Sequence, residues 1–302
     1  MSKKYKMVIA AAREDKPTVA VILMFVAVFL FTLIDSSAKW LILYGLPAVQ
    51  VIFARYCGAF LVLILLFIPR GGLNQFVSNN PKLQFSRAIA LLGGTTFNFL
   101  ALQFLPITTT IAIFFAMPLV ITVLGYFILG EKVGFRRFAA VFAGFVGVLI
   151  IIQPWGEDFH WAMILSVAAL FCASSYFILT RLLAGQDNNS TSQLWSSGVA
   201  TFAIAPFALQ SWHWPQTNMG FCVLVIIGVF GAISHILATR AHLLANASTL
   251  APTMYAQVIY ATAIGYFVFD TLPSGWTGLG TIIIIGSGLF IWRRENTFRQ
   301  KL

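Results

Sequence analysis

The sequence predicts an all-α membrane protein of ten transmembrane helices, arranged as two inverted repeats of five helices each. Three observations lead to this prediction: the composition, the length of the apolar runs and an internal repeat. Of the 302 residues, 59% are hydrophobic and 9% are charged, whereas a soluble globular domain carries about 25% charged residues. So few charges cannot cover the surface of a water-soluble protein, but a surface that faces lipid does not need them.

Apolar runs long enough to cross a bilayer recur along the whole chain. A hydrocarbon core about 30 Å thick requires roughly 20 apolar residues per helix. Because backbone groups in lipid must be satisfied within their own segment, we predict helices rather than strands. The predicted spans are residues 17–42, 46–68, 85–104, 107–129, 134–152, 160–181, 192–210, 219–240, 248–269 and 274–292.

The first span has some features of a signal peptide, because Lys and Arg residues precede an apolar stretch. That stretch, from Thr18 to Ile34, is longer than the roughly 7–15 residues of a signal's apolar region, and no clear cleavage site follows it. We therefore interpret it as the first membrane helix. Further along, Leu105-Pro106 alone separates the third and fourth spans, which predicts a tight helical hairpin.

The positive charges fall on one side of the predicted membrane. If the N-terminus is cytoplasmic, the cytoplasmic segments hold all of the 19 Lys and Arg residues except Lys39 and Arg55, which lie within helices. The outer loops carry Glu157, Asp158 and Asp270 instead. This asymmetry predicts a multi-pass protein of the bacterial inner membrane with both termini in the cytoplasm. The net charge of +10 is spread over these loops and does not indicate nucleic-acid binding.

An internal repeat relates the two halves of the chain. Residues 101–131 and 241–271 align with a shift of 140 positions and share a Gly-Tyr-Phe motif at 125–127 and 265–267. Each half then holds five spans, and an odd number inverts the second half in the membrane. Inverted repeats are a transporter architecture, with the solute site between the halves near the midplane. The predicted divisions are a cytoplasmic segment 1–16, repeats 17–154 and 155–292, and a cytoplasmic tail 293–302.

The order of several motifs carries a family resemblance. Arg87 opens the third helix, LPITTTIAIFFAMPLVITVLGYFILGEKVGFRR follows, and GFVGVLIIIQP closes the fifth, while the segment 35–39 (DSSAK) and Arg55 lie in the first two helices. In this order the chain resembles, over essentially its whole length, the EamA-type ten-helix branch of the drug/metabolite transporter superfamily. The resemblance implies a carrier of small organic metabolites without ATPase domains. The pattern looks closest to uptake carriers for riboflavin or S-adenosylmethionine.

We therefore expect a secondary transporter that works by alternating access. An exporter of amino acids or other metabolites is the alternative, and a membrane-embedded enzyme or a channel is the alternative class. The sequence has no HExxH, no P-loop and no dinucleotide-binding motif, so we predict no enzymatic activity, no cofactor and no metal site. The expected partners are the solute and membrane lipids, not nucleic acid, and a homodimer is left open.

Asp35 and Arg55 are the strongest candidates for the solute site, because ionisable groups within a membrane need a partner or a function. Asp35 lies in the outer half of the first helix, and Arg55 lies nine residues into the second, roughly 14 Å deep. The two residues are therefore predicted to approach each other or to face one cavity. They either bind the solute or form a structural ion pair. Lys39, one turn beyond Asp35, is predicted to snorkel to the interface.

Other polar and aromatic side chains in the predicted spans complete the candidate site. Each could contact the solute, or could join helices through a hydrogen bond of about 0.6 kcal/mol. Pro118 is predicted to kink the fourth helix, as a gating hinge or as a simple bend. Two ladders of small residues, which begin at Ala139 and Ala140, are predicted to pack helices together. The predicted solute-binding residues are Asp35, Arg55, Asn98, Phe115, Tyr176, His235, Tyr255 and Gln257.

Overall fold

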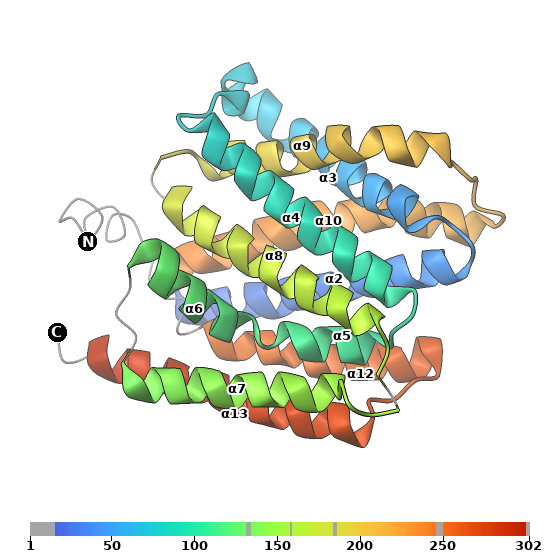
Figure 1. The fold of residues 1–302 in the computed structure, drawn as a ribbon. Helices are drawn as coiled ribbons and strands as arrows, with labels where there is room; N and C mark the ends of the chain where they lie inside the picture. The colour runs from blue at the N-terminus through green and yellow to red at the C-terminus, as the bar shows by residue number, and fades with distance from the viewer. Residues whose placement is uncertain (1–15, 131–133, 158, 184–185, 246–249, 300–302) are drawn as a thin grey trace.

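The computed structural model describes residues 16–130, 134–157, 159–183, 186–245 and 250–299, and a bundle of long helices accounts for most of them (Figure 1). Helical structure occupies each of the ten predicted spans. A short 3-10 helix, η1 (Leu73–Phe76), lies between the second and third. The spans are α2 (Pro17–Leu43), α3 (Ala48–Gly71), α4 (Pro81–Leu102), α5 (Ile107–Phe114) with α6 (Met117–Leu129), α7 (Phe135–Ile152), α8 (Ala162–Leu183), α9 (Asn189–Gln210), α10 (Asn218–Leu244), η2 (Ala251–Tyr255) with α12 (Ala256–Phe269), and α13 (Gly275–Arg299).

Six spans are long and apolar enough to cross a membrane by length and composition alone, and three others are shorter apolar helices. Helix α9 belongs to neither group, because it carries many polar residues. These side chains face the interior of the bundle, so the helix does not present them to lipid. The buried polar residues of α9 are Thr191, Gln193, Ser196, Ser197 and Thr201.

The two halves are interleaved. The most extensive contacts pair α2 with α10, α4 with α8, α7 with α13, and α3 with both α9 and α10. Every one of these pairs joins a helix of the first half to a helix of the second. Exchanging the halves converts the α2–α10 pair into α8–α4 and leaves α3–α9 and α7–α13 unchanged, as a two-fold relation between inverted repeats requires.

Glycines allow the closest of these approaches. A Cβ placed on Gly228 of α10 would lie 2.6 Å from the Cα of Gly58 on α3. On the other side of the bundle, a Cβ on Gly147 of α7 would lie 2.9 Å from the carbonyl oxygen of Gly280 on α13. The ladder that ends at Gly147 therefore packs α7 against α13, as predicted, while Gly144 of the second ladder faces Leu119 of α6.

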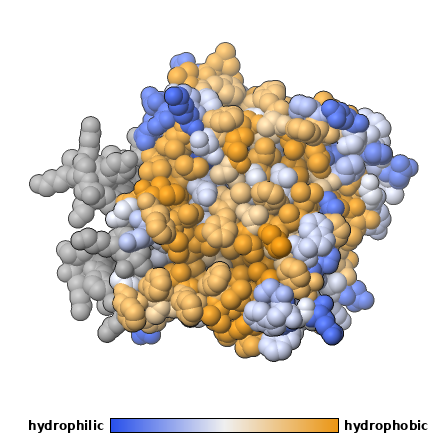
Figure 2. Space-filling model, viewed as in Figure 1, coloured by the Kyte–Doolittle hydropathy of each residue, from blue (hydrophilic) through white to orange (hydrophobic). Residues whose placement is uncertain are grey.

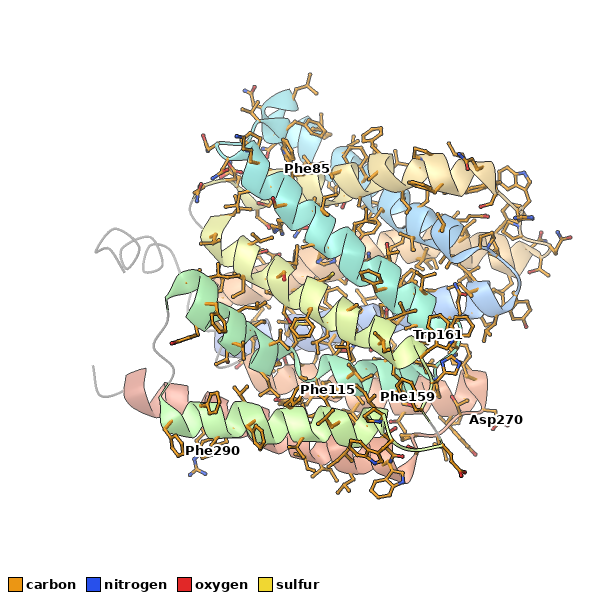
Figure 3. The ribbon with its side chains drawn as sticks, in the orientation of Figure 1. Phe85, Phe115, Phe159, Trp161, Asp270 and Phe290 are labelled. Carbon is orange, nitrogen blue, oxygen red and sulfur yellow. The ribbon has the colours of Figure 1, made fainter. Side chains whose placement is uncertain are left out.

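The surface is apolar over the middle of the helices and hydrophilic toward their two ends (Figure 2). Phenylalanines such as Phe127, Phe202 and Phe267 are largely exposed there, which suits contact with lipid chains. Trp161, at the predicted outer end of the sixth span, and Asp270, from a predicted outer loop, lie at one end of the bundle, and Phe290 lies toward the other (Figure 3).

The boundaries differ from the sequence prediction at three places. Helix α4 begins at Pro81, because Asn80 caps it by accepting a hydrogen bond from the Leu83 amide (3.3 Å). The fourth span is broken between Phe114 and Met117, with Pro118 in the first turn of the second part. Helix α13 continues to Arg299 and includes most of the predicted tail. The predicted segment 1–16 lies outside the described residues except for its last position.

Replacing Gly228 with Ala should destabilise the bundle. The new methyl group would meet the backbone of Gly58, which cannot rotate away, and overpacking of this kind costs about 1–3 kcal/mol. The measurement is thermal unfolding of the purified protein in detergent. Gly278→Ala is the matched control, because a Cβ at Gly278 meets nothing within 4 Å. Equal melting temperatures for the two variants would contradict the close α3–α10 contact.

Candidate functional site

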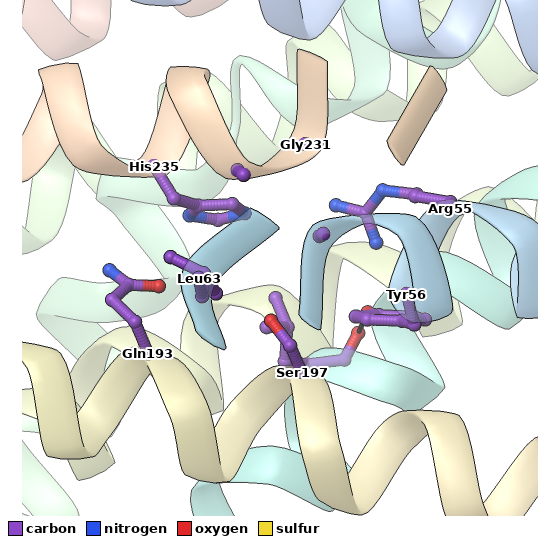
Figure 4. Close-up of a pocket in the computed structure, with 10 residues that line it drawn as sticks. Arg55, Tyr56, Leu63, Gln193, Ser197, Gly231 and His235 are labelled. Carbon is purple, nitrogen blue, oxygen red and sulfur yellow. Dashed lines mark hydrogen bonds between the residues drawn. The ribbon is translucent and has the colours of Figure 1, made fainter. Parts of the chain in front are cut away.

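A small pocket lies between α3, α4, α9 and α10, on the contact between the two halves (Figure 4). Its free space is comparable to a single water molecule, so the structure represents a closed conformation. His235 and Gln193 lie toward one end of the pocket, and Arg55 and Tyr56 toward the other (Figure 4). The lining residues are Arg55, Tyr56, Ala59, Leu63, Leu91, Gln193, Ser197, Gly231, Ala232 and His235.

Arg55 is the charged group of this pocket. Its side chain is 7% exposed, and its Nη1 donates a hydrogen bond to the Thr95 hydroxyl (2.8 Å). The guanidinium also lies over the ring of Tyr56, 4.6 Å from the ring centre, and the hydroxyls of Tyr56 and Thr95 are 2.7 Å apart. The buried Nε has no hydrogen-bond partner among the described residues. Arg55 therefore retains a donor for a further acceptor.

Asp35 and Asn98 form a second polar group beside the pocket. The Asn98 amide donates a hydrogen bond to the Asp35 carboxylate (3.0 Å), and Arg55 lies close enough to interact with that carboxylate electrostatically. Thr95 and Asn98 are three positions apart on α4, so one face of this helix contacts both charged residues. The Asn98 carbonyl oxygen is buried without a partner in the described part of the chain.

His235 enters the pocket from α10. Its ring packs edge-on against Phe31, with 5.1 Å between the ring centres. Both Arg55 and Arg87 interact with it electrostatically. Two arginines therefore face this region with Asp35 as the nearby carboxylate, which gives the site an excess of positive charge.

Arg87 is buried between α4, α8 and α9, and sequence reasoning had counted it only among the cytoplasmic charges. It is 2% exposed. It donates to the hydroxyls of Thr180, Ser196 and Tyr176 (2.7 Å each) and to the Ser192 carbonyl (2.9 Å). These partners are all neutral, and they belong to α8 and α9, so Arg87 joins the two halves. The sequence placed the start of this helix at residue 85, and the true start at residue 81 moves Arg87 one turn deeper.

Lys39 does not snorkel to the interface, so that prediction is wrong. Its side chain is 7% exposed, and its Nζ donates to the carbonyls of Leu102 (3.1 Å) and Leu105 (2.5 Å). These carbonyls end α4, where backbone acceptors lack partners and the helix dipole favours a cation. Lys39 therefore fixes the α4–α5 turn.

The chain matches the description "EamA-like transporter family" twice, over residues 18–153 and 160–293. The chain belongs to the EamA-like transporter family. Each match covers five of the observed helical spans, so an EamA chain of this kind is a ten-helix membrane protein built from two repeats.

Several bacterial proteins are similar to this EamA transporter over nearly its whole length. A riboflavin transporter of Vibrio cholerae serotype O1 is 30% identical over 300 residues, which cover 95% of this chain and 98% of the relative. A riboflavin transporter of Rhizobium johnstonii is 27% identical and covers 96% of each chain. An S-adenosylmethionine uptake transporter of Rickettsia bellii is 28% identical and covers 90% and 94%.

A solved structure shares this helical architecture. A crystal structure of a protein that is 18% identical covers 92% of this chain and 98% of its own, with a TM-score of 0.63. At this identity the likeness supports the architecture and not the solute.

The structure gathers part of the predicted site. Arg55 and His235 line the pocket, and Asp35 and Asn98 are joined beside it. Tyr176 lies apart, beneath Arg87. The other predicted contacts come from the α5–α6 break and from the η2 and α12 region. There Phe115 packs against Tyr255 with 5.7 Å between ring centres, and Gln257 is half-buried outside the set of pocket-lining residues.

Sequence reasoning missed Tyr56, Gln193 and Ser197. Tyr56 follows Arg55 directly and looked like an ordinary aromatic residue of an apolar span. Gln193 and Ser197 are four positions apart on α9, so they share one helix face. Their spacing in the least apolar span was the signal that could have identified them.

Replacing Arg55 with Ala should reduce transport at least tenfold at equal expression. The substitution removes the charged donor of the pocket and leaves the buried Thr95 hydroxyl with one partner fewer, a change that costs about 1–3 kcal/mol. The measurement is initial uptake rate together with thermal stability. Arg55→Lys separates charge from geometry, and Arg70→Ala, at the exposed end of α3, is the control. A fully active Arg55→Ala protein would exclude Arg55 from solute binding and leave it a packing role.

Proposed function

We propose that this EamA transporter takes up riboflavin, or a flavin closely related to it, across the bacterial inner membrane. The two halves, residues 17–154 and 155–292, rock about the pocket between α3, α4, α9 and α10. Both termini lie in the cytoplasm in this proposal, in agreement with the distribution of Lys and Arg residues.

The observation that carries the proposal is the buried Arg55 with a free donor and aromatic neighbours. The isoalloxazine ring of riboflavin is planar and neutral, and its two carbonyl groups accept hydrogen bonds. A guanidinium suits such acceptors, and aromatic side chains pack on such a ring. Tyr56 and Phe99 lie beside the guanidinium, within 4.6 Å and 6.0 Å of its centre. Asn98, Gln193 and Ser197 supply neutral groups for the remaining ring atoms and the ribityl hydroxyls.

S-adenosylmethionine is the second candidate solute, and Asp35 favours it. A half-buried carboxylate with one amide partner can balance the sulfonium and ammonium groups of that compound. However, Arg55, with Arg87 beyond it, surrounds the site with positive charge, which opposes a cationic solute. The charge of the pocket therefore favours riboflavin, and Asp35 is assigned to a proton or to a hydroxyl or imide N–H of the flavin.

Transport without catalysis completes the proposal. The family and its relatives are transporters, which argues against an enzyme. The proposed lipid contact is the apolar middle of the surface that Figure 2 shows. A homodimer, which the sequence leaves open, stays a prediction.

Uptake of labelled riboflavin by a riboflavin-requiring bacterium without its own transporter tests the proposal. Expression of this chain should give saturable uptake, because a carrier has a limited number of sites that reorient slowly. Unlabelled riboflavin at about twenty times its KM should remove nearly all of the signal. The same concentration of S-adenosylmethionine or amino acids should leave at least about 80% of it, which corresponds to an affinity roughly a hundredfold weaker.

Cells that carry the Arg55→Ala chain are the negative control. Accumulation of S-adenosylmethionine without riboflavin would transfer the assignment to the second solute. Loss of preloaded riboflavin from the cells, without uptake, would identify an exporter. Flux that does not saturate would indicate a channel.

A further inference from the structure

Hydrogen bonds join the two halves at both ends of the contact between α3 and α9, with the pocket between them. These helices run in opposite directions across the bundle, so the first turn of each lies near the loop that follows the other (Figure 1). A pocket with room for about one water molecule cannot admit an organic solute. One end or the other must therefore open during transport, and the contacts that hold each end can be identified.

The inner end is held by hydrogen bonds between the α3–α4 connection and the start of α9. Asp187 accepts hydrogen bonds from the Ser78 hydroxyl (2.5 Å), from the backbone N–H (2.7 Å) and the side-chain amide (3.1 Å) of Asn79, and from the Gln84 side chain (2.8 Å). Gln84 is fully buried, and the Ser190 hydroxyl donates to Gln75. We call these six residues the inner cluster: Gln75, Ser78, Asn79, Gln84, Asp187 and Ser190.

The outer end is held by the side chain of Gln50. This residue lies in the first turn of α3 and is fully buried. Its amide nitrogen donates to the His213 carbonyl (2.7 Å), and its amide oxygen accepts from the His213 backbone N–H (2.9 Å). His213 belongs to the α9–α10 connection. We call Gln50 and His213 the outer pair.

The inner cluster and the outer pair correspond to each other in the two repeats. Gln50 and Ser190 are 140 positions apart, the same shift that relates the repeated segments. Each lies in the first turn of its helix. Gln50 of α3 bonds to the connection that follows α9, and Ser190 of α9 bonds to the connection that follows α3. Both sets of bonds therefore cross the boundary between the halves, at opposite ends of the pocket.

We propose that the inner cluster and the outer pair are the two gates of this transporter, and that Asp187 and Gln50 are the residues that keep them closed. The naming of inner and outer rests on the orientation in the proposed function. The existence of two gates rests on the contacts alone.

The two gates differ in strength. Asp187 accepts four hydrogen bonds from three residues of the first half, and bonds to an ionised carboxylate are about twice as strong as neutral ones. Partial burial acts to raise the pKa of Asp187. The hydrogen bonds from Ser78, Gln84 and Asn79 outweigh this effect and hold the pKa below its ordinary value of 3.8, so the carboxylate is ionised at neutral pH. Among the described residues, the Gln50 side chain makes two neutral bonds. The outer gate therefore opens more readily, so solute from outside the cell can enter the pocket.

Labelling of a pocket thiol from each side of the membrane tests the gates. Ser197→Cys, in a chain whose three cysteines are replaced by Ala, places a thiol on α9 in the pocket. A membrane-impermeant methanethiosulfonate reagent reaches it from outside in intact cells and from inside in inverted vesicles. Gln50→Ala should speed labelling from outside, and Asp187→Asn should speed labelling from inside, each roughly tenfold for the loss of such bonds.

Matched controls lie next to each gate residue. Asn188 is next to Asp187, and the Asn188 side chain makes no capping hydrogen bond to α9, so Asn188→Ala is the control for the inner gate. Gln216→Ala, at an exposed residue of the α9–α10 connection, is the control for the outer gate. Both controls should label at the parent rate from both sides. Unchanged labelling in the two gate variants would overturn the proposal, and acceleration from the opposite sides would overturn the assignment of inner and outer. Correct labelling, together with the absence of riboflavin uptake by the chain with its own Ser197 and cysteines, would support the gates and refute the solute.

A reversible lock gives a test that does not depend on weakening the fold. Ser78→Cys with Asp187→Cys, in the chain otherwise free of cysteine, should form a disulfide, because the two side chains are in contact. Oxidation should block uptake at least tenfold, and a reductant should restore it. Each single-cysteine variant should be insensitive to both treatments. Full uptake by the oxidised, cross-linked protein would show that the inner cluster does not open during transport.

Discussion

The burial of arginine between membrane helices is the constraint on which this structure depends. A charge in a low-dielectric interior is costly unless hydrogen bonds surround it. Arg87 meets this requirement with four neutral oxygens from α8 and α9, so a residue of the first half holds two helices of the second. Arg55 meets it incompletely, because its Nε is buried without a partner in the described residues. The first arginine therefore joins the halves, and the second retains binding capacity beside the pocket.

The bilayer constrains the length and composition of each helix, so the helices could be predicted from hydropathy. The capping and side-chain contacts at the helix ends could not. Bilayer thickness sets the length of a span, so all ten spans could be predicted from apolar runs. Their orientation, which follows from the loop charges, stays a prediction. Capping by Asn80 moved the start of α4 four residues earlier, which hydropathy does not detect because Pro81 and Lys82 are not apolar. Lys39 was misjudged for a related reason. Its partners are backbone carbonyls at the end of α4, and sequence alone does not show which helix ends lie nearby.

The candidate site could be predicted where charge alone identified it. Asp35 and Arg55 stood out because ionisable residues within apolar spans are rare. The structure does place Asp35, Asn98 and Arg55 around one face of α4. Gln193 and Ser197 could be identified only once the rotation of α9 about its axis was known, because neighbouring positions on a helix point about 100° apart. Phe115, Tyr255 and Gln257 were grouped with the site because their helices border the centre of the bundle, yet their rotation places them outside the pocket.

Inverted repeats explain why one protein has two gates, and sequence divergence explains why the gates are unequal. A two-fold relation gives the first turns of α3 and α9 the same task at opposite ends of the pocket. Duplication supplies equivalent positions, but Gln50 bonds to a backbone segment, while Ser190 lies beside the carboxylate of Asp187. An ionised acceptor with four hydrogen bonds resists separation more strongly than a neutral amide with two bonds. The closed structure therefore opens at lower cost on the side of Gln50. In the proposed orientation, the positively charged loops on the Asp187 side face the cytoplasm, and the Gln50 side faces the periplasm. The weaker gate is then the outer one, which favours uptake over export.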